Sequence, residues 1–327
     1  MGGMRVVSLP EVAYGATAVR PDWGDLPAAL RDAIGLRLGA PVATATSAGG
    51  GFTRAFAALL GTSDGARAFI KAAPLGEPIA DWYAREAAIT AALPAAVPAA
   101  RLRWTLEAAG HFVLCLEAIP GRMPALPWTP ADLNAALTAW RTSAEALSRP
   151  GAELLNLGLP RLGDIVRDEL SWWSEIAAGR APLPPAPAWV PGRLGELAAL
   201  EQGLPELVTG SGMLHGDLRV DNILVDGYEG AWLCDWTWPC LGQPWFDTVT
   251  LLITAYASGL DVDAALEPWQ APPEGVDGAL AALGGYWLTS AARGPSSASP
   301  HSRQHQRFSG SQALAWLAER RSWTPPK

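Results

Sequence analysis

The chain changes its sequence texture at Pro120-Gly121, and this change limits the folds open to it. Before this point, short apolar segments alternate with glycine-containing turns, a pattern typical of β-hairpins. After it, apolar residues recur at helical spacing over long segments. The sequence therefore predicts an α+β fold, with a small antiparallel sheet and one main helix before this point and mostly helices after it. The length of 327 residues allows one large domain or two lobes.

The N-terminal lobe is expected to span residues 1–117. A leading helix is predicted over 25–38, where Gly39 and Pro41 end it, and the main helix over 79–93. Strands are predicted over 42–48, 53–60, 67–72, 102–108 and 112–117.

The C-terminal lobe is expected to span residues 118–327. The Pro- and Ala-rich segment 180–191 is predicted to be an extended connector, and short strands and turns are predicted over 212–235. Helices are predicted over 129–147, 161–176, 193–207, 244–258, 276–292 and 303–321.

Composition excludes several classes of protein. With 49% hydrophobic and 17% charged residues, the chain can build a core, which excludes a disordered protein. Its net charge of −8 argues against a nucleic-acid partner. No uninterrupted apolar stretch approaches the roughly 18 residues of a membrane helix, the start lacks a signal-peptide apolar region, and the three cysteines form no CxxC. We therefore expect a cytoplasmic protein with free thiols and no membrane partner.

The segment from His215 to Asp235 carries the strongest chemical signal. It reads HGDLRVDNILVD, and Trp232-Leu233-Cys234-Asp235-Trp236 follows. A hairpin turned at Asp226-Gly227 would bring Asn222 and Asp235 together at its open end, with Asp217 on the loop before it. Such an oxygen cluster suits Mg²⁺, which is commonly bound together with substrate phosphates. The alternative is a polar turn with solvated acids.

Lys71 and Glu86 form a second pair of interest. Lys71 and Lys327 are the chain's two lysines, whereas arginine supplies 22 of the 24 basic residues. Lys71 lies in an apolar predicted strand, and Glu86 shares an apolar helix face with Ile89. Because a buried carboxylate needs a cation, Lys71 is the expected partner of Glu86. Alternatively, Glu86 lies at the edge of this face and reaches water.

Gly49-Gly50-Gly51 separates the first two predicted strands. Glycines at such a turn let backbone N–H groups approach phosphate oxygens. The turn is not a Walker A motif, because no Gly-Lys-Ser/Thr follows it. An ordinary glycine-rich hairpin turn is the alternative.

HGDLRVDNIL followed by CDW resembles the aminoglycoside phosphotransferase and choline kinase-like family, relatives of the protein kinases. The shared pattern is H-G-D-x-x-x-x-N and then a strand that ends in Asp. The resemblance covers residues 25–320 and implies a protein-kinase-like two-lobed fold with ATP in the cleft. It implies that Asp217 is the base for the substrate hydroxyl, and that Asn222 and Asp235 are the Mg²⁺ ligands.

The same resemblance implies how the nucleotide is held. Lys71, paired with Glu86, would bind the α- and β-phosphates, and Gly50 and Gly51 would lie against the phosphates. Leu116 to Gly121 resembles the interlobe hinge, where Glu117 and Ile119 would pair with adenine; an ordinary linker is the alternative. Asp247, at a predicted helix start, would support the catalytic loop, and His215 would shape it.

The implied activity is transfer of the γ-phosphoryl group of ATP to a hydroxyl of a small molecule, a metabolite or an antibiotic, with Mg²⁺ and with Asp217 as base. GTP is an alternative nucleotide. A kinase for a peptide or protein hydroxyl, and a catalytically silent nucleotide-binding module, are alternative functions. Since Lys71, Glu86, Asp217, Asn222 and Asp235 occur together, a silent module is disfavoured.

The charge of residues 259–327 bears on the acceptor. An aminoglycoside is polycationic and would favour a pocket rich in carboxylates. This segment has six acidic and six basic residues, which gives no strong acidic field and argues against an aminoglycoside acceptor. They are Asp261, Asp263, Glu267, Glu274, Asp277 and Glu319, and Arg293, Arg303, Arg307, Arg320, Arg321 and Lys327.

Overall fold

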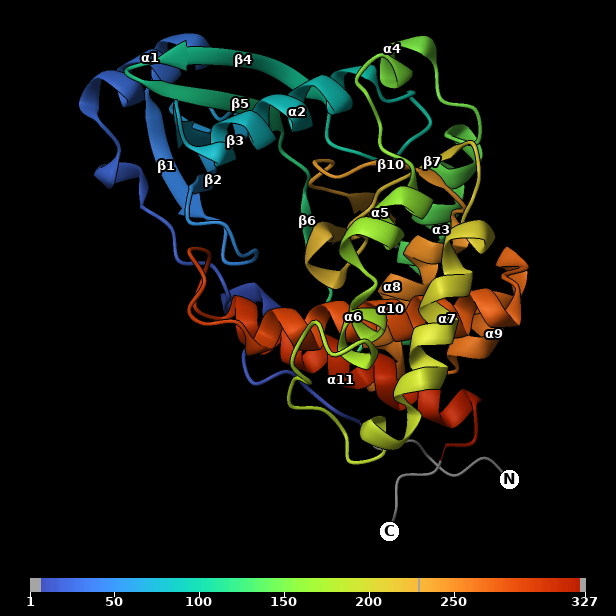
Figure 1. Cartoon of the computed structure of the whole chain (residues 1–327). Helices are drawn as coiled ribbons and strands as arrows, with labels where there is room; N and C mark the ends of the chain where they lie inside the picture. The colour runs from blue at the N-terminus through green and yellow to red at the C-terminus, as the bar shows by residue number, and fades with distance from the viewer. Residues whose placement is uncertain (1–6, 229, 324–327) are drawn as a thin grey trace.

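The computed structural model describes residues 7–228 and 230–323. The N-terminal part is an antiparallel five-stranded sheet with strand order β1-β2-β3-β5-β4 (Figure 1). The larger C-terminal part is mostly helical. This confirms the predicted α+β, protein-kinase-like arrangement. The strands are β1 Val42–Ser47, β2 Phe56–Thr62, β3 Arg67–Pro74, β4 Leu102–Ala108 and β5 His111–Glu117.

Two helices pack on opposite faces of this sheet. α1 (Ala28–Leu38) packs with alternate residues of β3 such as Ile70. Because neighbouring residues of a strand point to opposite faces, Lys71 faces away from α1. α2 (Pro78–Ala92) contacts β3 and β5 on that second face. The strand period therefore directs Lys71 toward α2.

The helices of the C-terminal part surround one large apolar core. α10 and α11 lie side by side and form the most extensive helix pair (Figure 1). The helices are α3 Pro130–Ala146, α4 Ala152–Leu155, α5 Leu162–Glu169, α6 Trp172–Ala177, α7 Leu194–Leu207, α8 Trp245–Ala257, α9 Val262–Leu266, α10 Pro273–Ala292 and α11 Ser302–Arg320.

Five further short strands lie outside the five-stranded sheet, and the segment 215–222 lies between two of them, β7 and β8. They form a three-stranded sheet, β6-β8-β9, and a two-stranded sheet, β10-β7. Their bounds are β6 Gly121–Arg122, β7 Gly212–Leu214, β8 Ile223–Asp226, β9 Ala231–Leu233 and β10 Cys240–Gly242. The predicted hairpin turned at Asp226-Gly227 is thus confirmed as β8 and β9.

The helix predicted over 161–176 is instead two helices, α5 and α6. The chain breaks at Leu170-Ser171, where the Ser171 hydroxyl donates to Val166 O over 2.8 Å. The buried Glu201 carboxylate accepts the Trp173 N–H at 3.0 Å and so begins a new helix. The break thus depends on a carboxylate 28 residues further along the chain, so the local sequence pattern does not predict it.

Ser8 and Tyr14, close to the first described residue, contact the C-terminal helices. Ser8 N–H donates to Ala257 O over 2.8 Å, and the Tyr14 hydroxyl lies 2.6 Å from Nδ1 of His305.

The lobe boundary at residues 117/118 stays a prediction. Among the described residues, no helix combines the length and apolar character needed to cross a membrane. Cys115, Cys234 and Cys240 are free.

Candidate active site

Lys71 joins the two parts of the molecule through two carboxylates. Its Nζ lies 2.8 Å from Oε1 and 2.7 Å from Oε2 of Glu86 on α2, and 3.3 Å from Oδ1 of Asp235, which follows β9. Lys71 is 8% exposed and Glu86 is 1% exposed, so this ion pair is buried. The Glu86 side chain therefore does not reach water at the edge of the helix face, and the predicted pairing of Lys71 with Glu86 is confirmed.

The charges of Lys71 and Asp235 stabilise one another. Burial acts to lower the pKa of Lys71, but the carboxylates of Asp235 and Glu86 outweigh it and raise the pKa. Burial likewise acts to raise the pKa of Asp235, but Lys71 and the Thr237 hydroxyl hold it at about 2. Both Lys71 and Asp235 are therefore charged at neutral pH.

Asp235 has the backbone geometry of a specialised site. Its φ is +64°, in the left-handed region that non-glycine residues seldom adopt. The Thr237 hydroxyl donates to its Oδ1 over 2.8 Å. This turn aims the carboxylate at Lys71 while leaving 43% of the side chain exposed. An exposed, ionised carboxylate oxygen can bind a metal ion. The neighbouring Lys71 ammonium group can bind phosphate oxygens.

The catalytic-loop segment fixes both oxygens of the Asp217 carboxylate. Asn222 Nδ2 donates to Oδ2 of Asp217 over 3.1 Å and to its backbone oxygen over 2.8 Å. Nη1 of Arg219 donates to Oδ1. Burial raises the pKa of Asp217 to about 7, and Arg219 opposes that rise. A fixed carboxyl that titrates near neutral pH suits a general base.

Arg219 is itself held by Asp221. Its Nε and Nη2 donate to the two carboxylate oxygens of Asp221 over 3.0 and 2.9 Å, and the Asp221 side chain is fully buried. The guanidinium also lies 5.6 Å from the centre of the Phe52 ring, in the glycine-rich loop. Sequence reasoning missed this bidentate pair.

Asp221→Asn should lower the free energy of unfolding by about 3 kcal/mol, because it removes the charge of the fully buried, bidentate partner of Arg219 and leaves the guanidinium with Asp217 alone. Urea unfolding at pH 7 measures this loss. Arg167→Gln is the matched control, since it breaks exposed ion pairs with Asp164 and Glu206 and should change stability by less than about 1 kcal/mol. Equal, small losses in both variants would contradict the role given to Asp221.

His215 and Asp247 hold the backbone of the catalytic loop through buried hydrogen bonds. Asp247 is 1% exposed and accepts the backbone N–H groups of His215 at 2.7 Å and Gly216 at 3.2 Å. His215 Nε2 lies 2.8 Å from Cys234 O, and Asp217 N–H donates to its Nδ1 over 3.3 Å. Burial lowers the pKa of His215 to about 4, so the ring is neutral. Both residues have the supporting positions expected of them.

The residues predicted to contact the nucleotide lie in two segments of the N-terminal part and its connector. Gly50 and Gly51 lie in the loop between β1 and β2, and Glu117 ends β5. Ile119 lies in the connector to β6, where its carbonyl accepts the Gly121 N–H at 3.0 Å. The Glu117 N–H donates to Arg101 O over 2.9 Å. The adenine contacts of Glu117 and Ile119 stay predictions.

The residues present fit a magnesium ion shared with a nucleotide. Within the described residues, no group of three or more His, Cys, Asp or Glu side chains could hold a metal. Mg²⁺ in nucleotide sites, however, takes one or two protein oxygens and completes its shell with phosphate and water. Asp235 supplies an ionised oxygen. Asn222 uses its Nδ2 toward Asp217, which leaves its carbonyl oxygen as the ligand atom.

The sequence also matches a known protein family over most of its length. Residues 44–286 match the model of the phosphotransferase enzyme family. The chain belongs to this family. Its matched span begins in β1, ends within α10 and includes every residue of the site described above, so the resemblance expected from the HGDLRVDN motif is confirmed.

Solved structures of other phosphotransferases share the fold. A thermostable variant of aminoglycoside phosphotransferase APH(4)-Ia, in complex with AMP-PNP and hygromycin B, has a TM-score of 0.61 at 12% identity, with 91% of this chain and 100% of that chain covered. Macrolide 2'-phosphotransferase MphH from Brachybacterium faecium has a TM-score of 0.57 at 16% identity, with 86% and 97% covered.

A third similar structure is that of a protein from Thermobifida fusca YX-ER1 that is named as a fructosamine-3-kinase. It has a TM-score of 0.54 at 17% identity, with 88% of this chain and 98% of that chain covered. No curated protein matches this phosphotransferase. At these identities the likeness shows the shared fold alone.

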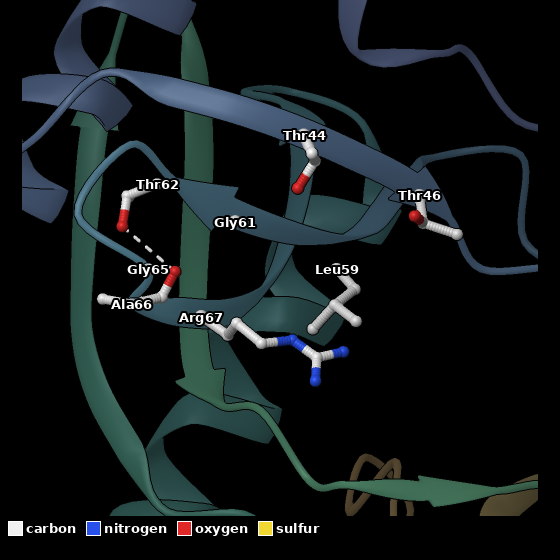
Figure 2. A pocket seen from close by; sticks show the side chains of 8 residues that line it. All are labelled: Thr44, Thr46, Leu59, Gly61, Thr62, Gly65, Ala66 and Arg67. Atoms are coloured by element: carbon white, nitrogen blue, oxygen red, sulfur yellow. Dashed lines mark hydrogen bonds between the residues drawn. The ribbon is translucent and has the colours of Figure 1, made fainter.

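A cavity elsewhere on this phosphotransferase offers no comparable chemistry. It measures about 260 Å³ and lies on β1, β2 and the turn to β3, with Arg67 as its one charged lining residue (Figure 2). The Thr62 hydroxyl donates to Ala66 O there over 3.0 Å. Lys71 is four residues further along β3, about 13 Å away at strand spacing. The Lys71 site is therefore the candidate active site.

Proposed function

We propose that this protein transfers the γ-phosphoryl group of ATP to a hydroxyl of a small molecule, in a Mg²⁺-dependent reaction. One observation supports this most: Lys71 bridges Glu86 on α2 to Asp235 after β9, beside a catalytic loop whose Asp217 carboxylate is fixed at both oxygens. This arrangement has a cation for phosphates, oxygen ligands for Mg²⁺ and a base for a hydroxyl.

Each residue of the site has a distinct role in this proposal. Lys71 binds the α- and β-phosphates, and Glu86 keeps its ammonium group in place. Asn222 and Asp235 hold Mg²⁺, which screens the phosphate charge when it is bound. The acceptor oxygen attacks the γ-phosphorus, the bond to the β–γ bridging oxygen breaks, and ADP leaves. The acceptor proton passes to the Asp217 carboxylate.

The acceptor class is proposed from the protein's relatives and its own charge. The similar structures include enzymes named for aminoglycosides, macrolides and fructosamines, all of them hydroxylated small molecules. In this chain, Asp277 pairs with Arg320 and Arg321, at 2.7 and 3.4 Å, and Arg320 reaches Asp263 at 3.2 Å. These acids are neutralised, which supports an acceptor that is not a polycation.

A label-transfer screen tests this function. The protein is incubated with γ-labelled ATP, Mg²⁺ and panels of neutral, acidic and cationic hydroxylated compounds and of peptides with Ser, Thr or Tyr, and labelled products are separated. We expect transfer to at least one neutral or acidic compound, and loss of the signal when EDTA removes Mg²⁺. Absence of transfer to every panel would contradict the proposal, and transfer confined to peptides would replace it with a peptide kinase.

A further inference from the structure

The carbonyl groups of the glycine-rich loop, residues 49–53 between β1 and β2, accept hydrogen bonds from residues outside the loop. We call residues 14–20, which precede α1, the strap. The strap's Ala18 N–H donates to Gly49 O over 2.9 Å. Its Arg20 donates through Nη2 to Gly50 O over 2.6 Å. Two successive loop carbonyls therefore point toward the strap.

The next two carbonyls are held on the same side. The Thr17 hydroxyl of the strap donates to Gly51 O over 3.2 Å, and the Ser299 N–H donates to Phe52 O over 2.7 Å. Ser299 is fully buried, and its hydroxyl donates to Thr17 O over 2.5 Å. The segment before α11 and the strap are thus joined. Figure 1 shows that segment rising toward the loop between β1 and β2.

This arrangement determines where the loop's N–H groups point. In a trans peptide, the C=O of one residue and the N–H of the next point in opposite directions. Four successive carbonyls face the strap and Ser299, so the N–H groups of residues 50–53 face away from them. None of these four N–H groups has an acceptor among residues 7–228 and 230–323. Successive N–H groups that face one side form an anion-binding concavity.

The glycines are explained by the closeness of the strap. A Cβ on Gly49 would lie 2.2 Å from Gly15 O, and one on Gly50 would lie 3.2 Å from Tyr14 O. Tyr14 anchors the strap, since its hydroxyl lies 2.6 Å from Nδ1 of the buried His305 on α11. The glycines therefore let the strap approach closely, and the strap in turn orients the loop.

We infer that Arg20 and Thr17 are positioning residues that hold the loop carbonyls away from the nucleotide, so that the N–H groups of residues 50–53 form the phosphate cradle. This inference rests on the function proposed above. A loop carbonyl that turned inward would repel phosphate oxygens, whereas one bound to a guanidinium or hydroxyl stays outside. The N-terminal segment, which precedes the matched family span, is thus part of the nucleotide site.

Binding of MgATP and of adenosine to Arg20→Met tests this inference. Isothermal titration calorimetry should show MgATP affinity about 10- to 100-fold weaker, because a charged hydrogen bond to Gly50 O is lost. Adenosine affinity should stay within about 3-fold, since adenosine has no phosphate. Thr17→Val should shift MgATP affinity in the same direction by a smaller factor, because the hydrogen bond that it removes is not charged. Arg20→Lys should restore part of the affinity.

Arg54→Met is the matched control. Arg54 also lies beside the loop, but its Nε donates over 2.9 Å to Ala298 O, which is not a loop carbonyl. Its MgATP affinity should equal that of the wild type. The inference is overturned if Arg20→Met and Arg54→Met bind MgATP alike, or if Arg20→Met weakens adenosine as much as MgATP. A wild type that binds no MgATP would instead overturn the proposed function itself.

Discussion

Asp217→Asn should lower kcat for phosphoryl transfer by about 10²- to 10⁴-fold while leaving MgATP affinity nearly unchanged. The carboxamide keeps the size of the side chain but cannot accept the acceptor's proton. Lys71 and Asp235, which are proposed to bind the nucleotide and its metal, are untouched. Steady-state kinetics with a labelled acceptor, together with nucleotide titration, separate the two effects.

Asp226→Asn provides the control for this variant. Asp226 ends β8 in the same segment, and its carboxylate accepts the N–H groups of Tyr228 and Gly230 at 2.8 and 2.9 Å. It should retain wild-type turnover. If Asp217→Asn also transferred phosphate at the wild-type rate, Asp217 could not be the base.

Lys71→Met should abolish measurable MgATP turnover and also lower the free energy of unfolding by about 3–5 kcal/mol. The loss of stability arises because Glu86, 1% exposed, then remains buried without its cation. The loss of activity arises because the α- and β-phosphates lose their ammonium partner. Urea unfolding and MgATP-dependent turnover report these two losses independently.

The double variant Lys71→Met/Glu86→Gln separates structure from chemistry. Removing the charge of Glu86 should return much of the lost stability, since an amide is less costly to bury than an unpaired carboxylate. Turnover should stay absent, because the phosphates still have no cation. Recovery of turnover along with stability would show that Lys71 serves folding alone.

The parts of the site that depend on local sequence could be predicted. The spacing from Asp217 to Asn222 and the Asp226-Gly227 turn place the catalytic-loop residues through a hairpin whose register is local. The period of β3 directs Lys71 toward α2, where helical periodicity places Glu86. These are relations within single elements or between neighbours, which residue spacing encodes.

The parts that depend on distant contacts could not be predicted. Tyr14 and His305 are nearly the whole chain apart, and no spacing rule pairs them. The strap donates hydrogen bonds to the glycine-rich loop, which lies 30 or more residues further along the chain, and no local pattern predicts contacts over that separation. Arg219 and Asp221 are two residues apart, but their bidentate pairing requires a loop conformation that no local sequence pattern predicts.

A crystal structure of the protein with Mg²⁺ and a non-hydrolysable ATP analogue tests the central claim most directly. We expect one Mg²⁺ bound by the Asn222 and Asp235 side-chain oxygens and by phosphate oxygens, with the Lys71 ammonium against the α- and β-phosphates. The γ-phosphate should face Asp217. A nucleotide bound elsewhere, or a metal that contacts neither Asn222 nor Asp235, would contradict the account.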